Sequence, residues 1–210
     1  MSSNILRVHL IFVFSLFLCR YGICADENDE LLLDMKSYLN SRIPVFLQGL
    51  NQSFLRDAFS IIPADFAGIK IRKFFKEIYR EDTSGIKKNS GDYQALISSA
   101  DRGVGLVRIR FINGKFEPVS LGAQQIAQRL HSLQNELYGS EFESGIDTVG
   151  IFIRDWMARF DAVKFSQAPG ALYYTFENRG GALAKKKNTG LTEDDLNRMR
   201  KQKIRSVTND

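Results

Sequence analysis

The sequence predicts an all-α protein, a compact and mainly α-helical domain that carries one short β-hairpin. Three observations predict this fold class. Apolar residues recur at the three- and four-residue spacing of amphipathic helices along most of the chain. Prolines and glycines stand at the ends of these periodic segments, where helices begin and end. The composition of the 210 residues, 44% hydrophobic and 25% charged, is typical of a globular protein with one domain or at most two small ones.

The first 25 residues have the layout of a secretory signal peptide. Arg7 precedes an apolar run at 10–19, and small residues follow up to Ala25. We therefore expect a secreted, extracellular protein. Both cysteines and one of the two histidines lie in this segment, so the mature chain would have no disulfide and only His131 as a histidine. Thiol catalysis and zinc sites built from cysteine and histidine are thereby excluded.

Three amphipathic helices are predicted in the first half of the domain 26–178, at 31–39, 44–62 and 64–81. Acidic residues at 26–30 precede the first of them, where they suit the positive end of a helix. Pro44 and Pro63 stand where the second and third begin, because a helix tolerates proline in its first turn. The third helix would place its apolar side chains within an arc of about 140°.

The second half of the domain is predicted to contain a short helix at 93–100, a β-hairpin at 106–119, helices at 120–138 and 146–163, and an apolar element at 171–176. In the hairpin, apolar residues alternate with Arg108 and Arg110, and Asn113-Gly114 occupies the turn. Gly139 follows the helix at 120–138, and the helix at 146–163 carries Trp156.

Residues 179–210 are predicted to form a basic, partly disordered C-terminal tail. The tail holds nine Lys and Arg against four Asp and Glu, so the basic character of the chain belongs to it. Anionic lipid surfaces and glycosaminoglycans are the expected partners of this tail, and nucleic acid is not expected because of the signal peptide. Within the tail, Thr192 and Asp195 predict the start of a helix.

No catalytic residue, metal site or cofactor is predicted, and we expect no enzymatic activity. His131 falls about 100° from the centre of its helix's apolar stripe, which predicts a solvated side chain. Gly103-Val104-Gly105 lacks the third glycine of a dinucleotide-binding loop. Asn51-Gln52-Ser53 is an N-glycosylation sequon, which makes Asn51 a candidate modification site. In a continuous helix over 44–62, Asn51 would point into the apolar half.

Three stretches of the chain match the motifs of one known family. They are Ile62-Pro63-Ala64-Asp65-Phe66 followed by Phe74-Phe75-Lys76-Glu77-Ile78-Tyr79-Arg80-Glu81-Asp82, then Arg129-Leu130-His131-Ser132-Leu133, then Phe152-Ile153-Arg154-Asp155-Trp156-Met157-Ala158-Arg159. In order and spacing the three stretches resemble the nematode fatty-acid- and retinol-binding proteins, which are small, secreted, helical lipid carriers.

The resemblance implies an apolar cavity between amphipathic helices that binds fatty acids or retinoids such as retinol. It implies a lining of Phe74, Phe75, Ile78, Leu130, Leu133, Phe152 and Ile153. The wide apolar face predicted at 146–163 adds Trp156 and Phe160, and Arg129 and Arg154 are candidates to meet a carboxylate head group. The alternative is a secreted, non-enzymatic interaction protein with a packed core and a basic tail for acidic partners or surfaces.

Overall fold

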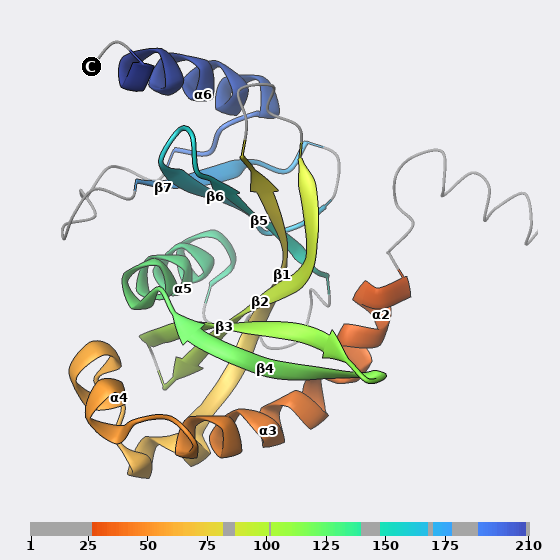
Figure 1. Cartoon of the computed structure of the whole chain (residues 1–210), viewed down its shortest axis with the longest axis vertical. Coiled ribbons are helices and arrows are strands. Elements are labelled where there is room, and N and C mark those ends of the chain that lie inside the picture. The colour runs from red at the N-terminus through yellow and green to blue at the C-terminus, as the bar shows by residue number, and fades with distance from the viewer. Residues whose placement is uncertain are drawn as a thin grey trace, which may run out of the picture.

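In the computed structural model, the residues described are 27–81, 87–100, 102–139, 148–167, 170–177 and 189–208. The predicted signal peptide at 1–25 lies outside them, so secretion stays a prediction. The described elements form one seven-stranded mixed sheet with helices on both faces (Figure 1). The protein therefore has an α/β fold. The prediction of an all-α, helical protein is wrong.

The sheet has the strand order β4-β3-β2-β1-β5-β6-β7. Its strands are β1 (Ile69–Arg80), β2 (Lys88–Ser99), β3 (Arg102–Ile112), β4 (Lys115–Gly122), β5 (Gly150–Asp155), β6 (Phe160–Lys164) and β7 (Tyr173–Glu177). The helices are α2 (Glu27–Asp34), α3 (Lys36–Gln48), α4 (Gln52–Phe59), α5 (Gln124–Tyr138), α6 (Glu193–Thr208) and the 3-10 helix η1 (Pro63–Gly68). All neighbouring strands are antiparallel except the central pair, β1 and β5.

Strand β1 replaces most of the helix predicted at 64–81. It lies in the middle of the sheet and is covered on both faces, so consecutive residues are buried on opposite sides. Phe74 packs beneath α3, whereas Phe75 packs beneath α5. A strand buried on both faces shows no alternation of apolar and polar residues, and its near-continuous apolar run also fits a helical arc. Tertiary burial therefore decided between the two structures.

The predictions of helices at 146–163 and 93–100 are also wrong, because these segments too form strands that are buried in the sheet. The first of these segments contains the antiparallel pair β5 and β6, in which Phe152 faces α5 and Ile153 faces α6. The second forms β2. The predicted β-hairpin is present as β3 and β4, although it is longer and belongs to the large sheet. Asn113 and Gly114 have φ angles of 51° and 79°, as its tight turn requires.

The N-terminal helices cover one face of the sheet. Pro44 lies inside α3 instead of at the start of a helix. Helix α3 ends before Gly49, and α4 begins at Gln52. Asn51 caps α4, its Oδ1 accepting hydrogen bonds from the backbone N–H groups of Ser53 and Phe54. Asn51 is consequently exposed and does not face the core. Its glycosylation stays a prediction.

Helix α5 covers part of the opposite face, and α6 covers the end of the sheet formed by β5, β6 and β7 (Figure 1). Gly103 allows α5 to touch β3, since a Cβ at that position would lie 2.2 Å from the carbonyl oxygen of Ala127. The helix predicted from Thr192 is confirmed as α6. It belongs to the segment interpreted as a tail, but its Leu196 is fully buried against the sheet. No helix among the described residues is long and apolar enough to cross a membrane.

Candidate functional site

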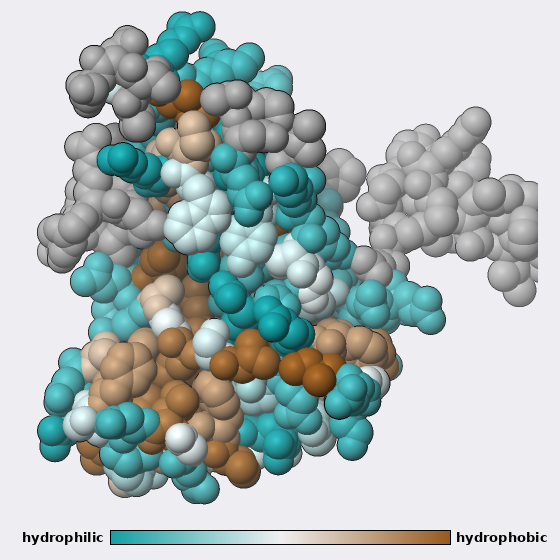
Figure 2. All heavy atoms as spheres, viewed as in Figure 1, coloured by the Kyte–Doolittle hydropathy of each residue, from teal (hydrophilic) through white to brown (hydrophobic). Residues whose placement is uncertain are grey.

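A charged cluster occupies the part of the sheet face that continues beyond α5. Beneath α5 the strands contribute apolar side chains, among them Phe75 and Phe152. Two residues further along β1 and β5, on the same face, stand Glu77 and Arg154. We define the charged cluster as Glu77, Asp92, Arg108, Arg110, Arg154 and Asp161. Figure 2 shows hydrophilic and pale aromatic side chains across the middle of the molecule, and apolar ones gathered below, over α3, α4 and β4.

Glu77 is the centre of the cluster and is completely buried on the central strand. Arg108 reaches it across β2, with Nε 3.3 Å from Oε2 and Nη2 donating to Oε1 at 3.5 Å. Arg154 approaches from β5 on the other side, with Nη2 3.6 Å from Oε1. An unpaired buried carboxylate would be strongly destabilising. One carboxylate therefore holds two guanidinium groups from opposite sides of β1.

Two further acids lie behind these arginines. Asp92 accepts two hydrogen bonds of 2.8 Å from Arg110, and its carboxylate is 3.8 Å from Nε of Arg108. Asp161 lies opposite Arg154 on β6, 3.7 Å from its Nε. The acids are nearly buried, whereas the side chains of Arg108 and Arg154 are 28% and 22% exposed. The cluster consequently presents its cationic groups to solvent and keeps its acids underneath.

Two pKa shifts describe the electrostatics of the cluster. The hydrogen bonds that Arg110 donates to the Asp92 carboxylate raise the pKa of Arg110 above its ordinary value. Burial, with a contribution from the Glu77 carboxylate, raises the pKa of Tyr79 on β1. Tyr79 therefore stays protonated near neutral pH, and its oxygen accepts a hydrogen bond of 3.3 Å from Arg108. Its phenol serves as a structural partner of the arginine and not as a base.

Hydrogen bonding within the cluster is incomplete. Nε of Arg108 and Oε2 of Glu77 are both buried, yet neither makes a hydrogen bond with the described residues. The contacts of Arg108 and Arg154 with the described residues use Nε and Nη2. No hydrogen bond or ion pair with the described part of the chain uses Nη1 of either guanidinium, which leaves two N–H donors on each. Buried polar groups are normally satisfied, and partly satisfied ones in a native structure are often found at functional sites.

A pocket of about 260 Å³ adjoins the two arginines. It is lined by Gln94, Leu106, Arg108, Ser120, Leu121, Gly122, Ala123 and Arg154. Gln94 and Ser120 are the register partners of Arg108 on β2 and β4, so these three line the pocket in one row. Helix α5 begins directly after Ala123, which brings the positive end of its dipole to the pocket edge. The positive charge of the two arginines and the positive end of the α5 dipole both favour a negatively charged ligand.

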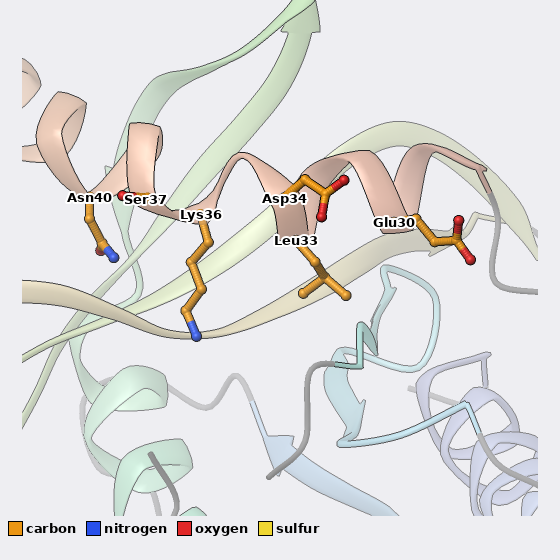
Figure 3. A pocket seen from close by; sticks show the side chains of 6 residues that line it. All are labelled: Glu30, Leu33, Asp34, Lys36, Ser37 and Asn40. Atoms are coloured by element: carbon orange, nitrogen blue, oxygen red, sulfur yellow. The ribbon is translucent and has the colours of Figure 1, made fainter. Parts of the chain in front are cut away.

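A second, wider pocket lies along α2 and α3. Its volume is about 630 Å³, and its lining residues are Glu30, Leu33, Asp34, Lys36, Ser37 and Asn40. Figure 3 shows Leu33, Lys36 and Asn40 pointing to the same side of the two helices, with Glu30 at one end. Asn40 is already engaged, because its Oδ1 accepts a hydrogen bond from the backbone of Ile71. This pocket is an open groove of mixed charge and offers less specific chemistry than the charged cluster.

The residues predicted to line a lipid cavity are distributed over both faces of the sheet. Phe75, Phe152, Leu130 and Leu133 pack together between the sheet and α5, and Phe74 lies on the other face beneath α3. Three others, Ile78, Ile153 and Phe160, pack with α6. Arg129 lies on α5 with its guanidinium 5.2 Å from the ring of Phe176. Arg154 alone lines the pocket beside the charged cluster, and Trp156 is exposed next to it.

Two features of this region were not anticipated. His131 is 5% exposed, so the prediction of a solvated histidine is wrong; its helix α5 is buried over a wider arc than the aliphatic stripe alone indicates. Glu77 was not identified as a functional residue. In the amphipathic helix predicted at 64–81, an acidic residue such as Glu77 is expected on the solvent-exposed side. The alternation of Arg108 and Arg110 with apolar residues was the only local signal that pointed to this face.

Comparisons with known proteins add no family to this picture. No protein-family model, no curated protein and no solved structure matches the chain. The resemblance to the nematode lipid carriers therefore stays a prediction, and the function has to be inferred from the charged cluster and its pocket.

Proposed function

We propose that the protein binds a small molecule through an oxyanion, of the carboxylate or phosphate type, between Arg108 and Arg154. One observation carries this proposal. A single buried carboxylate, Glu77, holds two guanidinium groups from opposite sides of the central strand. Both arginines line a pocket of about 260 Å³, and their Nη1 donors make no hydrogen bond or ion pair with the residues that the structure describes. Oxyanions are the groups that such paired, planar donors bind best.

The charged cluster is suited to binding because it is ordered before a ligand arrives. Arginine side chains lose considerable rotamer entropy when they are immobilised. Here Glu77, Asp92 and Asp161 already hold the guanidinium groups, so less of this entropy is lost on binding. A bound oxyanion would lie on the solvent side of the arginines, opposite the buried acids.

The pocket volume limits what can be enclosed. Pockets that enclose drug-sized ligands have volumes of about 300–1,000 Å³, so this smaller pocket accommodates a head group, and the rest of the ligand would lie outside. A fatty acid carries a suitable carboxylate, which keeps the predicted binding of fatty acids as a proposal for this site. Retinol carries a hydroxyl group without charge and is therefore a control for the proposal.

Titration with acetate, octanoate or inorganic phosphate tests the proposal. Trp156 is the only tryptophan of the chain, and its ring lies 5.7 Å from the Arg154 guanidinium, so its fluorescence reports on the site. We expect a saturable change at constant ionic strength. Arg108→Gln and Arg154→Gln should each weaken binding about tenfold or more, because a hydrogen bond to a charged group contributes roughly 1.5–3 kcal/mol. Ligand-observed NMR checks the variants independently of fluorescence.

Arg56→Gln is the matched control, because Arg56 is an exposed arginine on α4 that pairs with the neighbouring Asp57. This variant should bind like the wild type. The proposal is overturned if none of the three anions gives saturable binding, or if Arg56→Gln weakens binding as much as Arg154→Gln does. Binding of retinol without binding of any anion would instead favour an apolar carrier.

A further inference from the structure

Trp156 is exposed beside the proposed oxyanion site. It is 58% exposed, more than any other large hydrophobic side chain in the described part of the chain. Its backbone N–H donates to the carbonyl of Arg80 at 3.2 Å, which continues the pairing of β5 with β1 by one residue. Trp156 follows Arg154 by two residues and therefore lies on the same face of the sheet.

The ring of Trp156 is positioned by Arg154. The Arg154 guanidinium carbon lies 5.7 Å from the ring centroids of both Phe152 and Trp156, so this side chain extends along two aromatic rings. Phe152 is fully buried, whereas Trp156 leaves a large part of its ring in water. Cation–π contacts of this kind favour one ring orientation. The exposed part of the Trp156 ring is thus available to a ligand.

A second aromatic side chain borders the site. Tyr79 is the register partner of Arg154 on β1, and its hydroxyl is tied to Arg108. Tyr79 is half-buried, so part of its ring is accessible as well. The two arginines that line the pocket consequently have one aromatic ring beside them on β1 and another directly after the end of β5.

We propose that the ligand is an aromatic carboxylate whose ring stacks on Trp156 while its carboxylate binds Arg108 and Arg154. This inference rests on the proposed function. The pocket is too small to enclose a large ligand, and Trp156 provides the adjoining surface. Stacked rings have centroid separations of about 4.5–7 Å, so a ring attached to a carboxylate at Arg154 is within reach of Trp156. Stacking also removes exposed tryptophan surface from water.

Benzoate and cyclohexanecarboxylate form the probe pair that tests this inference. They have the same charge and nearly the same size, but only benzoate has a planar π-system. We expect benzoate to bind about three- to tenfold more tightly, as offset stacking allows. Trp156→Leu should abolish this preference and Trp156→Phe should retain it in part. Isothermal titration calorimetry and ligand-observed NMR measure both variants without tryptophan fluorescence.

Phe54→Leu is the control, because Phe54 is a 48% exposed aromatic residue on α4. It should leave the benzoate preference unchanged. If none of acetate, octanoate and inorganic phosphate shows arginine-dependent binding to the wild type, the proposed function itself fails. If one of these anions binds but benzoate and cyclohexanecarboxylate bind equally, or if the preference survives Trp156→Leu, only the aromatic inference is overturned.

Discussion

The Glu77 carboxylate is buried on the central strand and therefore requires positively charged partners, because a buried charge without partners costs several kcal/mol. Arg108 and Arg154 supply the positive charge from two different strands. Their long side chains reach the buried acid while their guanidinium groups remain near the surface. A residue whose role is structural in the core thus determines where two binding groups stand.

Burial of Tyr173 predicts that the stability of the protein depends on pH above pH 10. Burial, with the Glu193 carboxylate nearby, raises its pKa from 10.0 to about 12. Because the folded pKa lies above the unfolded value, this contribution to stability is fully present below pH 10 and is lost as pH rises toward 12. The melting temperature of the wild type should therefore fall more steeply above pH 10 than that of Tyr173→Phe. Tyr138→Phe, at a 40% exposed position, should behave like the wild type, and equal slopes for all three would contradict the expectation.

Helix α6 is held to the sheet by buried charges as well as by apolar contacts. Nε of Arg200 lies 2.5 Å from Oδ2 of Asp155, the last residue of β5, and both side chains are nearly inaccessible. Arg80 at the end of β1 donates to Asn197 at 3.2 Å. Glu193 in the first turn of α6 pairs with Lys87. These contacts make α6 a packed part of the domain.

Loss of the Arg200 side chain should therefore destabilise the whole domain. Arg200→Met removes the guanidinium that pairs with Asp155, and breaking a buried pair typically costs about 3–5 kcal/mol in the free energy of unfolding. Arg198→Met is the matched control, because Arg198 is 75% exposed and pairs with Asp195 on the same helix; its effect should stay within about 0.5 kcal/mol. Urea denaturation measures both. Equal effects would show that α6 is not anchored through Arg200.

The whole molecule depends on one parallel strand pair. β1 and β5 join the four-stranded half formed by β1–β4 to the half formed by β5–β7. The core beneath α5 crosses this junction, since it contains Leu96 and Leu106 from one half and Phe152 and Val163 from the other. Neither half can lose this contact without exposing apolar surface, so both should unfold together.

Cooperative unfolding can be measured with two probes. Trp156 fluorescence reports on the end of β5, and far-UV circular dichroism reports on the whole sheet; their urea transitions should coincide. Leu130→Ala, in the core beneath α5, should lower both midpoints together, because truncating a buried leucine costs about 2–5 kcal/mol. An earlier transition of the fluorescence signal, in either protein, would mean that the β5–β7 half unfolds separately.

Local features were predicted correctly where the residues themselves specify the conformation. Asn113 and Gly114 adopt positive φ angles, so the hairpin turn could be recognised from two residues. Helix α5 has one buried face and ends at Tyr138, directly before Gly139, so its periodicity was visible, although residues 120–122 of the predicted helix belong to β4. The same reasoning failed for residues 69–80 and 150–164, where both faces of the strands are buried and the pattern fits a helix equally well.

By itself, then, the sequence determined the turn between β3 and β4, the helices α5 and α6, and the presence of arginines on alternate positions of β3. Only the tertiary structure decided that the central segments are strands and that Glu77, Arg108 and Arg154 meet. These three residues lie on three different strands, β1, β3 and β5, and the sheet brings them together through long-range pairing. No local pattern encodes such a contact, because its stability comes from burial that exists only after the strands have paired.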